Sequence, residues 1–180
     1  MRSERTATVL RHTGLAFAGL FAGFLITVLV LELSLRGFDG SVYTQVRQVE
    51  LRRLDDLASA TLLPALLTTA LLAATTFRAR GRTFWLTSTA FALLLTVLVT
   101  TLAFNLPINA DQLDWTAQAP PADWTRVRDR WQIAHAVRTA SAVLAFGLLT
   151  VAAAGTARTR VPDGATASDP AGPAVLRGAT

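Results

Sequence analysis

Residues 14–35 read GLAFAGLFAGFLITVLVLELSL, and this stretch decides the class of fold. Its length matches the ~20 mostly apolar residues that a helix needs to cross the ~30 Å hydrocarbon core of a bilayer. The run is too long for the apolar part of a signal peptide, and no convincing cleavage site follows it. The stretch therefore predicts a membrane-spanning helix that the mature protein retains.

The rest of the chain repeats this pattern three times. Residues 57–77, 84–105 and 134–154 are further apolar stretches of spanning length. Only 16% of all residues are charged and 52% are hydrophobic, whereas a soluble domain carries about 25% charged residues. This composition excludes a soluble globular, a disordered and a fibrous protein. We expect an all-α fold, an integral membrane four-helix bundle formed by residues 1–155.

The arginines between the spans predict the orientation of the bundle. The short turn at residues 78–83 contains Arg and no acid, and the N-terminal arm is also basic. The longer loops at residues 36–57 and 106–138 contain as many acids as arginines. Because positive charge in short loops marks the cytoplasmic side, we expect both termini on the cytoplasmic side of the cell membrane and both long loops outside. Residues 156–180 are rich in Ala, Gly, Pro and Thr and predict a disordered cytoplasmic tail.

Charge and cysteine content exclude several kinds of chemistry. The net charge of +5 and the pI near 11.3 would suit nucleic-acid binding, but the arginines are scattered and form no basic face. The chain has no cysteine, which excludes disulfides, iron–sulfur clusters and thiol chemistry. Only His12 and His135 supply an imidazole. The lipid bilayer is the partner that the composition predicts, and the sequence gives no indication of an oligomeric state.

Both outer loops are longer than the ~4–6 residues of a plain connection, and we expect both to be structured. In the first loop, Asp39 can cap a polar helix that continues from about residue 42 to 57, towards the second span. Pro64 should kink or restart the helix of that span. In the second loop, Pro107 disfavours a regular helix and should end the third span.

The last predicted helix carries an aromatic and cationic stripe. After a candidate N-cap at Asp123, steps of 4, 3, 4 and 3 residues place five side chains on one face: Trp124, Arg128, Trp131, His135 and Arg138. This face should look into the bundle, because an arginine near the middle of a bilayer costs at least ~2.5 kcal/mol. Glu32, the ionisable residue of the first span, should face the same interior and pair with Arg138, Arg128 or His135.

We therefore expect a pocket around His135 in the outer half of the bundle. Its other walls should come from the first span and the outer loops: Glu32, Tyr43, Arg47, Glu50, Asn105 and Asn109. From the residues alone, His135 fits a hydrogen-bonded interfacial side chain, a general base, or a metal ligand together with Glu32 and Glu50. The tryptophans fit an interfacial aromatic belt as well as a ligand site, and the arginines fit ion pairs that close the bundle. The two asparagines fit caps of the third span as well as ligand contacts.

The second outer loop and the last span resemble a known four-helix integral membrane family. The motifs are Asn105-Leu-Pro-Ile-Asn109, Trp115, Trp124, Arg128-Asp-Arg-Trp131 and His135-Ala-Val-Arg138. The recurring pattern of the family is Asn-x-Pro-x-Asn, a Trp, and then Arg-x-x-Trp-x-x-x-His-x-x-Arg. The family is a group of domains of unknown function that includes the anthrone oxygenases of aromatic polyketide biosynthesis. The resemblance covers residues 10–155, and its specific part is residues 105–138.

The resemblance implies an oxygenase that needs no cofactor and acts on a lipophilic aromatic molecule. The reaction would be the monooxygenation of a reduced tricyclic phenolic, such as an anthrone, to its quinone, with O2 as co-substrate. His135 would take a proton from the substrate carbon, and Arg138 or Arg128 would stabilise the oxyanion that forms. The rings would lie between aromatic side chains and the oxygens against amides: Trp115, Trp124, Trp131 and Tyr43, with Asn105 and Asn109.

Two other functions are compatible with these residues. One is a non-enzymatic membrane protein that binds a lipophilic ligand or a partner subunit through the stripe. The other is a metal-dependent membrane oxidase in which Glu32, Glu50 and His135 hold the metal. Elemental analysis of the purified protein separates the metal-dependent oxidase from the oxygenase that needs no cofactor.

Overall fold

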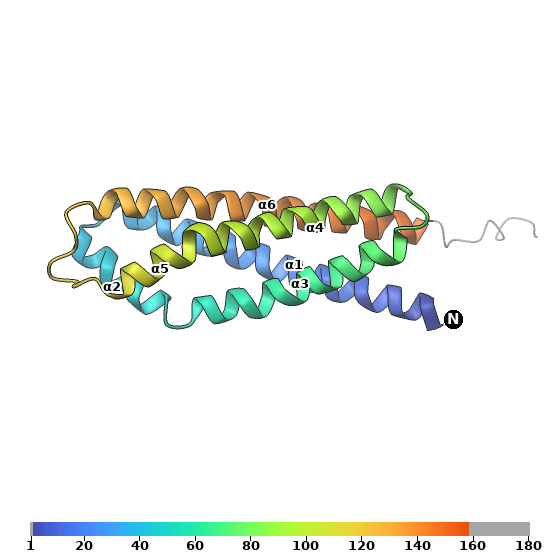
Figure 1. Cartoon of the computed structure of the whole chain (residues 1–180), viewed down its shortest axis with the longest axis horizontal. Coiled ribbons are helices and arrows are strands. Elements are labelled where there is room, and N and C mark those ends of the chain that lie inside the picture. The colour runs from blue at the N-terminus through green and yellow to red at the C-terminus, as the bar shows by residue number, and fades with distance from the viewer. Residues whose placement is uncertain (1, 159–180) are drawn as a thin grey trace, which may run out of the picture.

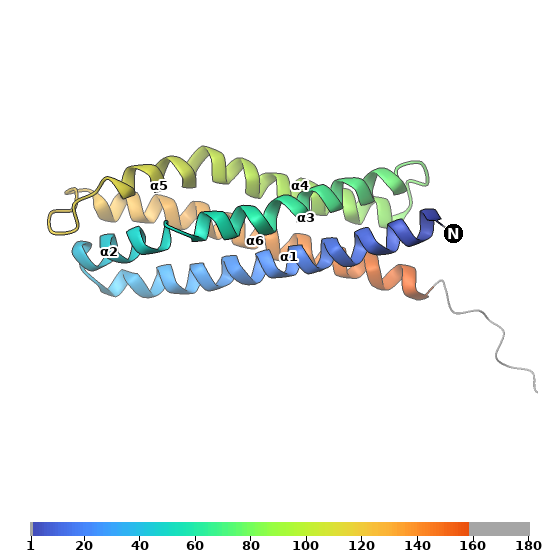
Figure 2. The ribbon, with the colours of Figure 1, turned by 90° about the horizontal axis from the view of Figure 1, so that it is seen from below.

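The computed structural model describes residues 2–158, and all regular secondary structure within this range is helical. Four long helices lie side by side along the long axis of the molecule (Figure 1, Figure 2). They are α1 (Arg2–Ser34), α3 (Leu54–Thr76), α4 (Arg82–Thr100) and α6 (Trp124–Arg158). The predicted fold class, an all-α four-helix bundle, is confirmed.

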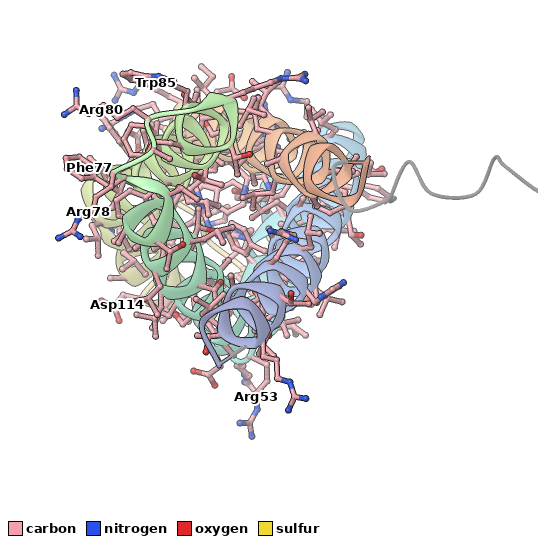
Figure 3. All side chains as sticks on the ribbon, turned by 90° about the vertical axis from the view of Figure 1, so that its right-hand side faces the viewer. Arg53, Phe77, Arg78, Arg80, Trp85 and Asp114 are labelled. Atoms are coloured by element: carbon pink, nitrogen blue, oxygen red, sulfur yellow. The ribbon has the colours of Figure 1, made fainter. Side chains whose placement is uncertain are left out.

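The surface of this bundle is suited to lipid. Four helical stretches are long and apolar enough to cross a membrane. Many large apolar side chains on the outside are more than half exposed, for example Leu20, Leu63, Val99 and Leu144. Figure 3 looks along the bundle and shows side chains pointing outward from every long helix. A soluble protein rarely exposes apolar surface on this scale, so the chain is a multi-pass membrane protein.

The helices extend beyond the predicted spans. The first helix begins at Arg2, well before the apolar run, and the last one continues to Arg158, past the predicted end of the domain. The remaining residues of the predicted tail, 159–180, lie outside the described residues. The two described ends of the chain lie at the same end of the bundle as the turn that contains Arg78 and Arg80 (Figure 1, Figure 3).

The opposite end of the bundle holds two short helices from the outer loops, α2 (Gly40–Glu50) and α5 (Leu106–Leu113) (Figure 1). The side chain of Asp39 accepts a hydrogen bond from the Val42 backbone at 3.0 Å, as the predicted N-cap requires. A Cβ atom on Gly40 would lie 2.8 Å from Pro120 and 2.9 Å from Trp124. Only glycine therefore lets α2 begin so close to the second outer loop.

One prediction about helix continuity in the first half of the chain is wrong, and of the two predicted effects of Pro64, a kink or a restart, the restart is absent. The first-loop helix ends at Glu50, and a turn separates it from α3. Because of this break, the polar face of α2 packs against the bundle, and α3 runs along the bundle as a separate helix. Pro64 does not restart the second span, because α3 continues through it from Leu54 to Thr76. A membrane helix can lose one backbone hydrogen bond where neighbouring groups compensate.

The third span does not end at Pro107 either. A π-helical turn, η2 (Thr101–Asn105), connects α4 directly to α5. Proline cannot donate a hydrogen bond to the carbonyl of Ala103, and a widened turn accommodates such a defect. Asn105 is fully buried in this turn, whereas its neighbour Phe104 faces outward. The π-helical turn thus directs one amide into the bundle interior.

Candidate functional site

A buried group of charged and amide side chains, called here the Arg47 cluster, joins α2 to α1 and α5. Its members are Arg47, Glu32, Glu50, Asn109 and Gln112. Arg47 Nη1 lies 2.9 Å from Oε1 of Glu32 and 2.7 Å from Oε2 of Glu50. Arg47 also donates from Nε to Gln112 at 3.0 Å and from Nη2 to Asn109 at 2.9 Å. Its side chain is only 2% exposed, so the two carboxylates and two amides satisfy a guanidinium that water does not reach.

The partner of Glu32 differs from the prediction. We expected an arginine or histidine of the last helix, namely Arg138, Arg128 or His135, but the ion pair is made with Arg47 of α2. The reason is that α2 folds back against the bundle and brings its side chains to the depth of the first span. Hydropathy predicts the depth of the four spans alone, so a contact between Glu32 and the helix of the first loop was not expected.

Two glutamines complete the cluster, and the sequence analysis missed both. Gln112 accepts from Arg47 and donates to the Tyr43 hydroxyl at 3.0 Å. Gln132 of α6 donates to the backbone oxygen of Glu32 at 2.8 Å and to its carboxylate at 3.2 Å. One signal for Gln112 was present, because steps of four and three residues from Asn105 place it on the same helical face.

Asn109 connects the Arg47 cluster to the stripe of the last helix. Its side-chain oxygen accepts from Arg47 and also from Trp131 Nε1 at 2.7 Å. Its side-chain nitrogen donates to both carboxylate oxygens of Asp55 at 3.2 Å. The Arg47 guanidinium lies 4.1 Å from the centre of the Trp131 ring, and the His135 ring is stacked on Trp131 with centroids 4.7 Å apart. The cluster therefore fixes the plane in which the imidazole lies.

The hydrogen bonds of His135 determine its tautomer. Nε2 lies 3.0 Å from the backbone oxygen of Leu25 in α1. A carbonyl oxygen can only accept, so Nε2 carries the hydrogen and the neutral ring keeps its lone pair on Nδ1. Nδ1 is buried and has no hydrogen-bond partner among the described residues. The residue thus presents one free basic nitrogen inside the bundle.

Arg138 lies one turn further along α6 and is the second unsatisfied group. Its side chain is 6% exposed, and it forms no hydrogen bond or ion pair with another residue in the range 2–158. A buried guanidinium whose donors are not all hydrogen-bonded is costly, although Asp55, which lines the same cavity, attracts it without forming an ion pair. This contrast with the saturated Arg47 marks Arg138 as the arginine that is free to contact a ligand.

The two unsatisfied groups face one small cavity, called here the His135 cavity. Its volume is about 30 Å³. Its lining combines apolar side chains of α1 and α3 with the polar groups just described: Phe24, Leu25, Val28, Leu54, Ala58, Arg47, Glu50, Asp55, Asn109, Trp131, His135 and Arg138. A space of this size holds a water-sized molecule. Asn105, a predicted wall residue, does not line this cavity; it donates to the Trp131 backbone oxygen at 3.4 Å, and its own side-chain oxygen has no partner among residues 2–158.

Four other predicted site residues lie above this cavity. Tyr43, Trp115 and Trp124 pack with Leu35 into an aromatic cap at the end of the bundle that holds α2 and α5. The Tyr43 and Trp124 rings are 5.5 Å apart. Arg128 lies over the Trp124 ring and pairs with Asp129 at 3.1 Å. The upper half of the stripe therefore closes the bundle, and only Trp131, His135 and Arg138 reach the cavity.

Burial changes the proton affinity of the two acidic groups on α2. Desolvation raises the pKa of Glu50, and the nearby Arg47 opposes this rise only in part. Burial likewise raises the pKa of the Tyr43 phenol above its ordinary value, with the negative Glu32 adding to the effect. Two carboxylates share the single charge of Arg47, and the negative Glu32 adds to the rise in the pKa of Glu50.

The suggested metal ligands do not converge. Glu32 and Glu50 both point to Arg47, and the free nitrogen of His135 faces the cavity. Within residues 2–158, no group of three or more histidine, aspartate and glutamate side chains is arranged to hold a metal ion.

Comparison with known proteins identifies the family. The family model for anthrone oxygenase matches residues 52–148, just over half of the chain. The matched part contains Asp55, Asn109, His135 and Arg138, whereas Arg47 lies before it. No curated protein and no solved structure matches the chain. The matched residues include α3, α5 and most of α6, which contribute Asp55, Asn109, His135 and Arg138 to the lining of the His135 cavity, and the chain belongs to the anthrone oxygenase family.

Proposed function

We propose that this protein is a membrane-embedded monooxygenase that acts without a cofactor on a reduced polycyclic phenolic of the anthrone type. The observation that carries the proposal is the free Nδ1 of His135, which is held in a fixed tautomer beside the unpaired Arg138. The family membership supports an oxygenase-like activity in general. The substrate class and the mechanism are inferred from the chemistry of these two side chains.

The first step is proton removal by His135. The methylene carbon of an anthrone is flanked by two aromatic rings, so its carbanion is stabilised and conjugated with the ketone. Nδ1 accepts the proton, as the free lone pair of a neutral imidazole can. The negative charge moves to the substrate oxygen, and the guanidinium of Arg138 stabilises it there.

The remaining steps need only O2. The carbanion gives electrons to O2 and forms a carbon–oxygen bond, which yields a peroxide on the former methylene carbon. Loss of the second proton from this carbon breaks the O–O bond, forms the new ketone and releases one water. One CH2 group and one O2 thus give one C=O group and one H2O, so atoms and electrons balance. Glu50, which lines the cavity, is placed to donate the proton that the leaving oxygen takes.

The size of the cavity sets a condition on this mechanism. A pocket that encloses a tricyclic molecule such as an anthrone usually has a volume of ~300–1,000 Å³. The His135 cavity has a volume of only about 30 Å³. The reacting edge of the substrate must therefore displace side chains as it reaches His135. Exclusion of water in such a tight site protects the carbanion from being protonated again.

We further propose that both termini lie in the cytoplasm and that the site opens from the outer half of the cell membrane. The basis is the difference in charge between the two ends of the bundle. Arg78, Arg80 and Arg82 occur together without an acid in the turn between α3 and α4, whereas the outer loops are neutral. This distribution follows the positive-inside rule.

The proposed function is tested with anthrone, air and the purified full-length protein in nanodiscs. Formation of anthraquinone is measured for the parent and for His135→Ala, Arg138→Lys and Arg126→Ala. His135→Ala should lose about 10²–10⁴-fold in rate, as expected for a general base. Arg138→Lys should also be poor, because lysine lacks the planar fork of donors. Arg126 is 76% exposed on the outer surface, so Arg126→Ala should behave like the parent. The same loss in Arg126→Ala as in His135→Ala would contradict the assignment.

A further inference from the structure

A second cavity lies beside the His135 cavity and opens at the lipid-facing surface. It lies in the seam between α3 and the run from α4 to α5, and its volume is about 90 Å³. At its mouth, Leu63 and Leu102 are more than half exposed, and Ser59 is also exposed. At its inner end lies Arg138, which is 6% exposed. The cavity therefore leads from the surface that faces lipid to a buried cation.

This seam cavity and the His135 cavity share three lining residues, Asp55, Ala58 and Arg138. The two spaces are therefore neighbours in the bundle. The π-helical turn η2 contributes to the mouth of the seam through Thr101 and Leu102. A helix is wider at such a turn, and π-turns are frequent at functional sites. The seam is thus the place where a small separation of two helices would join the lipid surface to His135.

The lining of the seam defines the chemistry of its ligand. Half of its lining residues are leucines, which suit flat apolar rings. Its inner end pairs Asp55, whose carboxylate can only accept a hydrogen bond, with Arg138, whose guanidinium can only donate. A hydroxyl group donates and accepts at once, so a phenol satisfies both. Nε of Arg138 has no hydrogen-bond partner among residues 2–158, so this donor is left for the oxygen of a ligand.

We propose that the seam between α3 and α4 is a binding site through which a flat lipophilic phenol reaches His135 from the bilayer, with its oxygen held by Arg138 and Asp55. This inference rests on the proposed function for the chemistry that follows, but it concerns binding and can be measured without turnover. The substrate comes from the membrane and not from water, since the mouth of the site opens among exposed leucines.

The test blocks the seam with a chemical group, called here the plug, that is attached to a single introduced cysteine after folding. The native chain contains no cysteine, so the group reacts at that position alone. Ser59→Cys is purified in nanodiscs and measured before and after complete modification with N-phenylmaleimide. Ala60→Cys is the matched control, because Ala60 is the next residue of α3, is exposed, and lines neither cavity. Binding is measured with a dihydroxyanthraquinone, which has the rings and hydroxyls of a substrate but no methylene carbon to react. Turnover is measured with anthrone.

Modification of Ser59→Cys should weaken dihydroxyanthraquinone binding by about tenfold or more and lower kcat/KM for anthrone to a similar extent. Modification of Ala60→Cys should change neither quantity. Anthracene, which has the rings but no oxygen, should bind the parent about tenfold more weakly than the dihydroxyanthraquinone. Equal binding before and after modification of Ser59→Cys would overturn the inference, as would a parent protein that does not bind the dihydroxyanthraquinone.

These measurements separate the inference from the proposed function. If the plug blocks binding but the parent does not oxidise anthrone, the seam is a binding site and the oxygenase mechanism is wrong. If Ser59→Cys oxidises anthrone at the same rate before and after modification, the mechanism stands and the substrate takes another path.

Discussion

The imidazole of His135 in α6 donates from Nε2 to the backbone oxygen of Leu25 in α1, over a distance of 3.0 Å. This bond leaves Nδ1 as the basic atom of the neutral ring, and the stack on Trp131 holds the ring plane in place. A general base needs both a free lone pair and a fixed direction. One interhelical hydrogen bond therefore accounts for the chemical state of the residue on which the proposed function depends.

The two buried arginines near Trp131 should respond to substitution to different extents. Arg47→Met leaves Glu32 and Glu50 without a counter-charge, and the loss of one partner from a buried ion pair costs about 3–5 kcal/mol. Arg138→Met removes a guanidinium that forms no hydrogen bond or ion pair within residues 2–158 and is attracted by Asp55 at longer range, so it should lower the melting temperature much less than Arg47→Met does. Thermal unfolding in detergent checks both variants. A larger loss of stability in Arg138→Met than in Arg47→Met would show that the roles are assigned the wrong way round.

Stability should fall as the pH rises because of Glu50. Burial raises the pKa of this carboxyl above its ordinary value of 4.5. A group whose pKa is raised in the folded state stabilises the protein fully below the unfolded pKa, and this contribution is lost as the pH rises through the folded pKa. The melting temperature of the parent should therefore decrease from about pH 4.5 upward, relative to that of Glu50→Gln.

Asp123→Asn is the control for this pH dependence. A hydrogen bond from Arg126 lowers the pKa of Asp123, which lies on the exposed start of the last helix. Its replacement should leave the downward slope in place. A parent and a Glu50→Gln variant with parallel curves between pH 4 and pH 8 would contradict the assignment of the raised pKa to Glu50.

The sequence alone predicts the four-helix fold, because the length and hydropathy of each apolar run determine by themselves whether that run crosses the membrane. Residues 14–35 must cross a bilayer whatever their neighbours do, and the same holds for the other three runs. Helix continuity is harder to predict, since it depends on what surrounds the break. Pro107 interrupts an isolated helix, but here a π-helical turn beside the last helix accommodates it. Local propensity could not show that the third helix continues to Leu113.

The site was only partly predictable for a related reason. The spacing correctly places His135 and Arg138 on one helical face, but it does not show which residues of that face line the cavity and which lie at the end of the bundle. Trp124 and Arg128 share the face and nevertheless lie in the cap. The pairing of Glu32 with Arg47 depends on the direction in which α2 folds back, which no spacing within one helix specifies. Contacts between helices had to come from the structure.

Removal of metal ions should not affect turnover. The proposed steps use only side chains and O2, so anthrone oxidation by the parent should persist after dialysis against a chelator. Metal analysis of the active protein is the companion measurement. Stoichiometric iron, copper or zinc together with loss of activity in the chelator would favour a metal-dependent oxidase instead.

The proposed orientation can be tested with single cysteines, since the native chain contains none. Gln118→Cys lies in the second outer loop and is exposed, and Arg80→Cys lies in the turn between α3 and α4. The test uses intact cells in which a membrane-impermeant maleimide reaches the outer face of the cell membrane. The reagent should label Gln118→Cys and leave Arg80→Cys unlabelled until the cells are lysed. The reverse pattern would place the termini outside and contradict the positive-inside assignment.

The most direct test of the central claim is proton exchange without oxygen. Anthrone deuterated at its methylene carbon is incubated with the protein under strictly anaerobic conditions, and loss of deuterium to water is followed by mass spectrometry. If Nδ1 of His135 removes the proton before O2 reacts, the parent should catalyse this exchange, and His135→Ala should be slower by about 10²–10⁴-fold. Arg126→Ala should exchange like the parent. A parent protein that oxidises anthrone in air but catalyses no exchange without O2, or a His135→Ala variant that exchanges at the parent rate, would contradict base-initiated catalysis by His135.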